Sequence, residues 1–146
     1  MRTVLIGLIA VGLLGCNELG SSPPPVAAIA ADAAPIDLDA IQPDPVGLLA
    51  LDDDARDRHF RRILHALNTA PAQHTAIRRH GDHIALAYWL ARDPDIRTGA
   101  LALWAQRSTI DRAATGDRTA VRKSLASMRA RFAAALGSDA SRLNPY

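Results

Sequence analysis

The sequence predicts an all-α fold: a small antiparallel bundle of about four helices over residues 51–138, behind a disordered tether. Three observations favour this fold class. Apolar residues in this region recur at intervals of three and four, which places them on one face of a helix. Alternating β-branched runs and Asn-Gly or Asp-Gly hairpin turns are absent from the 146 residues. The breaks between the periodic segments are short, and short connections join antiparallel neighbours.

The first helix of the bundle is expected from about Asp53 to Leu67. The three aspartates at 52–54 favour a helix start here, because the positive end of the helix dipole stabilises negative charge. Asp57 and Arg61 are four residues apart, so they can pair across one turn. The apolar positions that predict the buried face of this helix are Phe60, Ile63, Leu64 and Leu67.

A short break at residues 68–71 precedes the second helix, which is expected from Pro71 to about Arg92. Gly81 lies inside it. A glycine in a continuous helix costs about 1 kcal/mol, and the alternative is a break with Asp82 capping the next helix. We expect one continuous or kinked helix. Its candidate core residues are Ile77, Ile84, Tyr88 and Trp89.

The third helix is expected to begin at Asp93-Pro94, with the aspartate as N-cap and the proline as first residue. It runs to about Ala114, and Gly116 can take the left-handed conformation that closes it. Its candidate core residues are Ile96, Ala100, Leu103, Trp104 and Ile110.

The fourth helix is expected to be capped by Asp117 and to end at Gly137, followed by a mostly polar tail over residues 139–146. Its apolar residues recur at intervals of three and four, which makes it the most regular amphipathic stripe in the sequence. These residues are Val121, Leu125, Met128, Phe132 and Leu136.

The N-terminal residues have the order of a secretory signal peptide over 1–15. Arg2 and the amino terminus are positive, Val4–Leu14 is apolar, and the small Gly15 precedes Cys16. The apolar run is shorter than the roughly 18 to 20 residues that a membrane-spanning helix needs.

The residues Leu13-Leu14-Gly15-Cys16 resemble the lipobox of bacterial lipoproteins. This resemblance implies cleavage before Cys16 and lipidation of its thiol with diacylglycerol, usually with an amide-linked acyl chain such as palmitate. Several acyl chains give durable anchoring. In such lipoproteins an Asp after the cysteine favours the inner membrane. With Asn17 there instead, the resemblance favours the outer membrane, with the protein facing the periplasm.

Charge is divided along the chain. Residues 17–54 carry eight acidic and no basic residues, whereas residues 55–146 carry sixteen basic and seven acidic ones, a net charge of +9. The first part, over 16–50, is rich in Pro, Ala and Asp and is expected to be a disordered acidic tether. The second suggests an anionic partner. Export makes nucleic acid improbable, so we expect a membrane contact through the lipid and an envelope protein with an acidic surface.

Two arginine pairs are candidates for a basic interaction patch on adjacent helices, and the alternative is that they simply solvate helix faces. They are Arg61, Arg62, Arg78 and Arg79. His80 and His83 are three residues apart, so they share a helix face at a usable metal-ligand spacing. Ordinary surface histidines are the alternative interpretation of this pair.

No catalytic motif is present, and the folded region contains no glutamate. Cys16 is the only cysteine, so an acylated chain retains no thiol for catalysis, disulfides or metal binding. We therefore expect no enzyme activity and no cofactor besides the covalent lipid. The leading hypothesis is a lipid-anchored adaptor or assembly factor of an envelope complex. The alternatives are a periplasmic metal- or ligand-binding sensor and an immunity, inhibitor or exclusion lipoprotein. In layout alone, the chain is similar to secretion-system pilotins and lipid-anchored immunity proteins.

Overall fold

The computed structural model describes residues 35–112 and 118–145, with the side chains of 109–112 excepted. This part of the chain is helical and contains no strand, which confirms the predicted all-α class. Its elements are η2 (Leu38–Ala40), α1 (Pro45–Ala50), α2 (Asp53–Thr69), α3 (Gln73–Arg79), α4 (Gly81–Leu90), α5 (Pro94–Arg112), α6 (Arg118–Leu136) and η3 (Gly137–Arg142). The predicted signal peptide, Cys16 and the predicted helix boundary at Gly116 and Asp117 lie outside the described residues.

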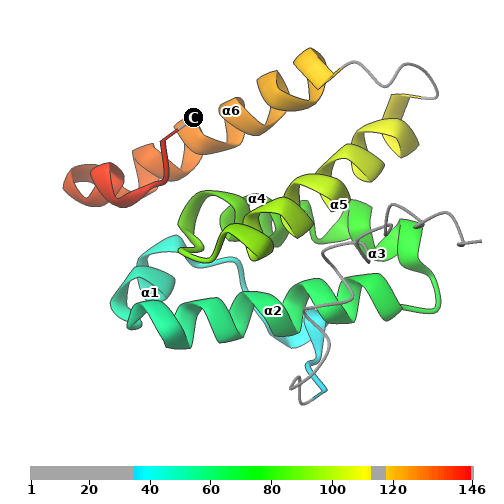
Figure 1. The fold of residues 1–146 in the computed structure, drawn as a ribbon, viewed down its shortest axis with the longest axis horizontal. Helices are drawn as coiled ribbons and strands as arrows, with labels where there is room; N and C mark the ends of the chain where they lie inside the picture. Colours follow the sequence, from blue (N-terminus) through cyan, green and yellow to red (C-terminus); the bar gives the residue numbers. More distant parts are fainter. Residues whose placement is uncertain (1–34, 113–117, 146) are drawn as a thin grey trace, which may run out of the picture.

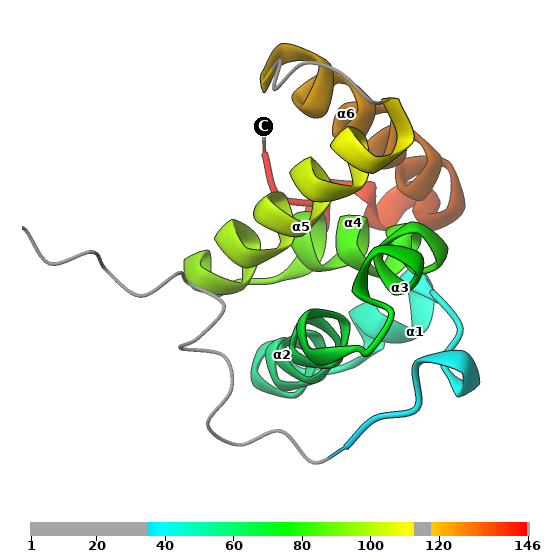
Figure 2. The same ribbon diagram turned by 90° about the vertical axis from the view of Figure 1, so that its right-hand side faces the viewer.

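The helices stack in three layers, with α2 on one side, α4 and α5 in the middle, and α6 on the other side (Figures 1 and 2). Figure 1 shows that α5 and α6 run in opposite directions, as an antiparallel hairpin requires. The short helix α1 lies at one end and packs against α6, whereas α3 packs against α2 and α5. Among the helices in the described residues, none is long and apolar enough to cross a membrane.

Helix α4 is the centre of the core. Eight of its ten residues are buried, the exceptions being Asp82 and Tyr88. A helix that is apolar on every side is stable only when other elements surround it. Helices α2, α3, α5 and α6 all contact α4.

Most of the predicted core residues are buried, including all four on α2 and the last four of the α6 stripe. Tyr88 and Val121 are only partly buried against this core. The side chain of Ile110 lies outside the described residues. The sequence pattern missed Leu86 and Leu90, because a helix buried on all sides has no polar face to define its period.

The prediction of one helix from Pro71 to Arg92 was wrong. The segment forms α3 and α4, which meet at His80 with φ −102° and ψ 30°, outside helical geometry. This break lets α3 and α4 follow different directions, so α3 packs on α2 and α5 while α4 occupies the centre. The sequence analysis gave a break at Gly81 as the alternative to a continuous helix, and the break lies next to that glycine. Asp82 does not cap α4 as that alternative supposed, because it lies in the first turn of the helix.

The predicted start of ordered structure at residue 51 was also wrong. Residues 45–50 form α1, whose Leu48 and Leu49 are buried in the core. Pro45 lies in the segment expected to be a linker, but it is the first residue of this helix. A proline fits there because the N–H group at that position has no hydrogen-bond partner within the helix. Residues 35–44, called the strap below, run along the domain surface ahead of α1, and Leu38 packs against the core.

The C-terminal residues 139–146 were expected to be a polar tail, but those up to 145 fold back on the domain. Leu143 is buried beside the core. The Asn144 side chain donates to the carbonyl oxygens of Tyr88 and Ala91, at 3.3 and 2.7 Å. These bonds satisfy carbonyls at the end of α4 that have no partner within the helix. The tail is therefore a cap of the central helix.

Candidate functional site

His80 and His83 lie together where α3 meets α4, as their spacing predicted. Their ring centroids are 5.5 Å apart and the rings are tilted by 58°. Both residues are buried, with exposed fractions of 8% and 4%. Nε2 of His80 lies 3.5 Å from a carboxylate oxygen of Asp39 in the strap, whereas Nε2 of His83 is buried without a hydrogen-bond partner.

Burial lowers the pKa of both histidines, because a buried imidazole cannot be solvated when charged. For His83 the neighbouring His80 and His59 lower the pKa further, and Asp82 and a backbone hydrogen bond with Ile41 oppose them. For His80 the carboxylate of Asp39 opposes the effect of burial. The pair is therefore held in its neutral form, the form that ligates metals.

A complete metal site is not assembled around this pair. Within the described residues, no group of three or more His, Cys, Asp or Glu side chains could hold a metal ion. The structure brings together two imidazoles, with Asp39 beside one of them. A metal bound here would need further ligands from solvent or from a partner.

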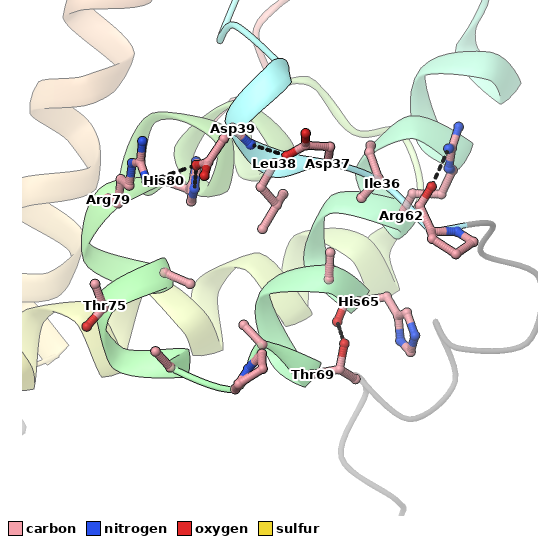
Figure 3. Close-up of a pocket in the computed structure, with 16 residues that line it drawn as sticks. Ile36, Asp37, Leu38, Asp39, Arg62, His65, Thr69, Thr75, Arg79 and His80 are labelled. Carbon is pink, nitrogen blue, oxygen red and sulfur yellow. Dashed lines mark hydrogen bonds and ion pairs between the residues drawn. The ribbon is translucent and has the colours of Figure 1, made fainter.

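A groove of about 710 Å³ separates the strap from α2 and α3 (Figure 3). Its lining is mainly apolar and includes Ala66 on α2 and Ala76 on α3. Leu38 points into the groove from the strap. At one end, Arg62 donates to the carbonyl oxygen of Pro35 at 3.4 Å. The strap thus forms one wall of a cavity in the size range of small-molecule sites.

The four arginines of the predicted basic patch lie on α2 and α3, and two of them form ion pairs with different carboxylates. Its members are Arg61, Arg62, Arg78 and Arg79. Arg61 forms an ion pair with Asp93 at the start of α5. Arg79 forms an ion pair with Asp39 of the strap, at 3.0 Å. Arg62 and Arg79, one from each pair, both line the groove beside the strap, and the basic patch stays a prediction.

Arg78 and Arg79 share a cavity with a third arginine. Together with Thr75 and Arg107 they line a cavity of about 380 Å³ between α3 and α5. We call the three arginines the arginine cluster. The sequence analysis did not predict Arg107 as a site residue. A glycine at position 81 was the one hint of a close approach to α4, because a Cβ atom there would lie 2.6 Å from Nε of Arg107. The glycine lets this guanidinium approach the backbone of α4.

A second group of charged residues surrounds the connection between α4 and α5 and is called the corner network. Asp57 of α2 accepts hydrogen bonds from the backbone N–H groups of Arg92 and Asp93, at 3.0 and 2.9 Å. Arg56 donates to the carbonyl oxygen of Leu90 at 3.1 Å. The expected pair of Asp57 and Arg61 does not form, because the carboxylate faces inward to these backbone groups.

Helix α6 carries the largest charge of one sign among the helices in the described residues. It contains five basic and no acidic residues. Arg118, Arg122 and Lys123 are exposed. Arg129 stacks over the ring of Trp89, with 5.6 Å between its guanidinium carbon and the ring centroid. Arg131 lies 3.5 Å from Asp82. The exposed part of α6 is a basic surface on the outer layer of the domain.

No protein-family model matches the chain, no curated protein matches it, and no solved structure matches it.

Proposed function

We propose that this chain is a lipid-anchored interaction module of the periplasm, an adaptor or assembly factor that binds an envelope protein with an acidic surface. The observation that carries the proposal is the basic surface of α6, with Arg118, Arg122 and Lys123 exposed on a helix that contains no acidic residue. A concentrated field of one sign attracts a partner of the other sign and raises its association rate.

The attachment point supports the same function. The lipobox sequence ending at Cys16 favours a lipid anchor in the outer membrane. The described part of the chain begins at Pro35, so residues 17–34 lie between the predicted anchor and the described domain. Eighteen residues would span about 23 Å as a flexible coil and about 56 Å as polyproline II. Either length keeps the domain close to the membrane but able to turn toward a partner.

Lipid attachment is tested by growing cells with an alkyne-labelled fatty acid and comparing the full chain with Cys16→Ser. The unsubstituted chain should carry the label and sediment with membranes, because acylation holds it there. The Cys16→Ser chain should carry no label. Equal labelling of both chains, or no label on either, would contradict the anchor.

The partner surface is tested by placing a photo-crosslinking amino acid at position 123 of the full chain in living cells. Position 58 serves as the control for position 123, because Arg58 is also an exposed cation but lies on α2, in the layer opposite α6 (Figure 2). We expect a discrete crosslinked envelope protein from 123 and not from 58, lost when Arg118 and Arg122 are replaced by Ala. The same products from both positions would overturn the proposal.

A metal-sensing function is the second candidate, and His83 is the observation that favours it. Its Nε2 atom is buried without a hydrogen bond beside His80, and a bound cation would satisfy it. Zinc titration of the full chain should then release heat and raise Tm, and His83→Gln should abolish both effects. No heat at micromolar zinc would remove this candidate.

A further inference from the structure

We propose that the cavity lined by Thr75 and the arginine cluster is a binding site for a phosphate group. This site lies between α3 and α5, and it adds a ligand to the proposed function without depending on it.

Helix geometry places three of the lining residues on one face. Arg78 and Arg79 follow Thr75 by three and four positions, so all three side chains project from the same side of α3. Helix α3 packs against α5, and Arg107 of α5 completes the lining beside these exposed side chains. Guanidinium groups bind phosphate oxygens through paired N–H donors, and a hydroxyl supplies one donor more. The lining therefore has the donors that a tetrahedral oxyanion requires.

Arg107 is held in place before any ligand arrives. Its guanidinium carbon lies 4.9 Å from the centroid of the Trp104 ring, a cation–π contact. Its other side faces the backbone at Gly81, where a Cβ atom would lie 2.6 Å from Nε and 3.1 Å from Cζ. A donor confined between a ring and a backbone loses little freedom on binding, which favours affinity.

The charge balance of the cavity favours an anion. Among the side chains that the structure describes, its lining holds three guanidinium groups and no carboxylate. Asp39 of the strap, which does not line the cavity, already forms an ion pair with Arg79 at 3.0 Å. A phosphate of charge near −2 supplies acceptor oxygens for several guanidinium groups at once, so it can bind in addition to such existing pairs.

The neighbouring groove indicates what kind of phosphate compound fits. Thr75 and Arg79 line both the arginine cavity and the mainly apolar groove beside it, and Figure 3 shows both residues on the α3 side of that groove. A phosphate that carries an apolar group could place one part in each. A phospholipid headgroup and free inorganic phosphate share the chemistry that the cluster recognises, so the experiment needs an arm for each.

The first arm titrates inorganic phosphate at constant ionic strength into the full chain in a nonionic detergent, with tryptophan fluorescence as the signal, because Trp104 contacts Arg107. The second arm titrates mixed micelles of phosphatidylglycerol, with phosphatidylcholine as reference. We expect a saturable change in at least one arm. R78A and R107A should weaken binding at least tenfold, whereas R58A, which removes an equally charged exposed side chain elsewhere, should change it less than twofold.

Gly81→Ala tests geometry without changing charge. The added methyl group displaces the Arg107 guanidinium, so affinity should fall at least threefold while the helix itself gains propensity. Saturation with phosphatidylglycerol alone assigns a lipid headgroup, and saturation with phosphate alone assigns the free anion. No saturation in either arm, or equal losses in R58A and R78A, would overturn the site. Those failures would leave the crosslinking test of α6 unaffected.

Discussion

Arginines gather at two places on this domain, and their surroundings differ. In the corner network, Arg56, Arg61 and Arg92 each meet a carboxylate, and Arg56 also donates to two backbone carbonyl oxygens. Hydrogen bonds from Arg56 and Arg92 lower the pKa of Asp53. In the cavity between α3 and α5, the described lining consists of three arginines and Thr75, and Arg79 pairs with Asp39 of the strap.

This difference separates two roles of arginine, a structural role in the corner network and a binding role in the cavity. Arg56 is 5% exposed and its neighbour Asp57 is 8% exposed, so charges buried this deeply must be matched by partners within the fold. Arg78 and Arg79 are exposed, where charge costs little and can attract a ligand. We therefore expect substitutions in the corner network to change stability and substitutions in the arginine cluster to change binding.

The largest effect should come from Asp57→Ala. The substitution leaves two partly buried N–H groups, those of Arg92 and Asp93, without their acceptor. Charge-assisted bonds of this kind are worth about 1.5 to 3 kcal/mol each, so the free energy of unfolding should fall by about 3 kcal/mol, measured by urea denaturation. Asp54→Ala, an exposed position in the same helix turn, should cost about 0.5 kcal/mol. Equal losses in the two variants would show that the corner network is not structural.

Arg56→Ala should have the next largest effect. It removes the donors to Leu90 and Leu51, at 3.1 and 3.2 Å, in a buried position. We expect a loss of about 2 kcal/mol in urea denaturation. Arg78→Ala should stay within about 0.5 kcal/mol, because its side chain is exposed. A loss in Arg78→Ala as large as that in Arg56→Ala would erase the proposed distinction.

A smaller effect should appear as pH dependence. Burial lowers the pKa of His59, His80 and His83 below the ordinary value of 6.5. The charged groups that act on these histidines are Asp39, Arg62, Arg79 and Asp82. The unfolded chain then binds more protons than the folded one as pH falls below about 6.5, so stability is lost on acidification.

The measurement is the urea midpoint at pH 7.5 and at pH 5.5, above the range in which carboxylates titrate. The midpoint should be lower at pH 5.5, and His83→Gln should reduce the difference. A midpoint that stays constant or rises on acidification in the parent protein would show that burial does not keep these histidines neutral.

Periodicity predicted the amphipathic helices well and the central helix poorly. The stripes on α2 and α6 repeat every three or four residues, so their boundaries and buried faces followed from the pattern. Helix α4 has no polar face, so its extent and its separation from α3 depended on tertiary packing around Gly81. Likewise, Leu48 and Leu143 are buried only because the chain ends fold back on distant helices.

The candidate site was predictable only where the residues are neighbours in sequence. His80 and His83 meet because they are three residues apart. Arg107 reaches Arg78 and Arg79 through the packing of α3 on α5, which no local pattern encodes. The sequence pattern also did not predict the hydrogen bonds of Asp57, because its partners on the α4–α5 connection are 35 and 36 residues away in the chain.

The most direct test of the distinction between the buried Arg56 and the exposed Arg78 is thermal unfolding of three full-length proteins with and without inorganic phosphate. A ligand that binds only the folded state raises Tm. The parent should gain Tm with phosphate. Arg56→Ala should begin about 10 °C lower and show the same gain, whereas Arg78→Ala should begin near the parent and show little gain. If both variants begin equally low and gain equally with phosphate, the two groups of arginines do not differ in role.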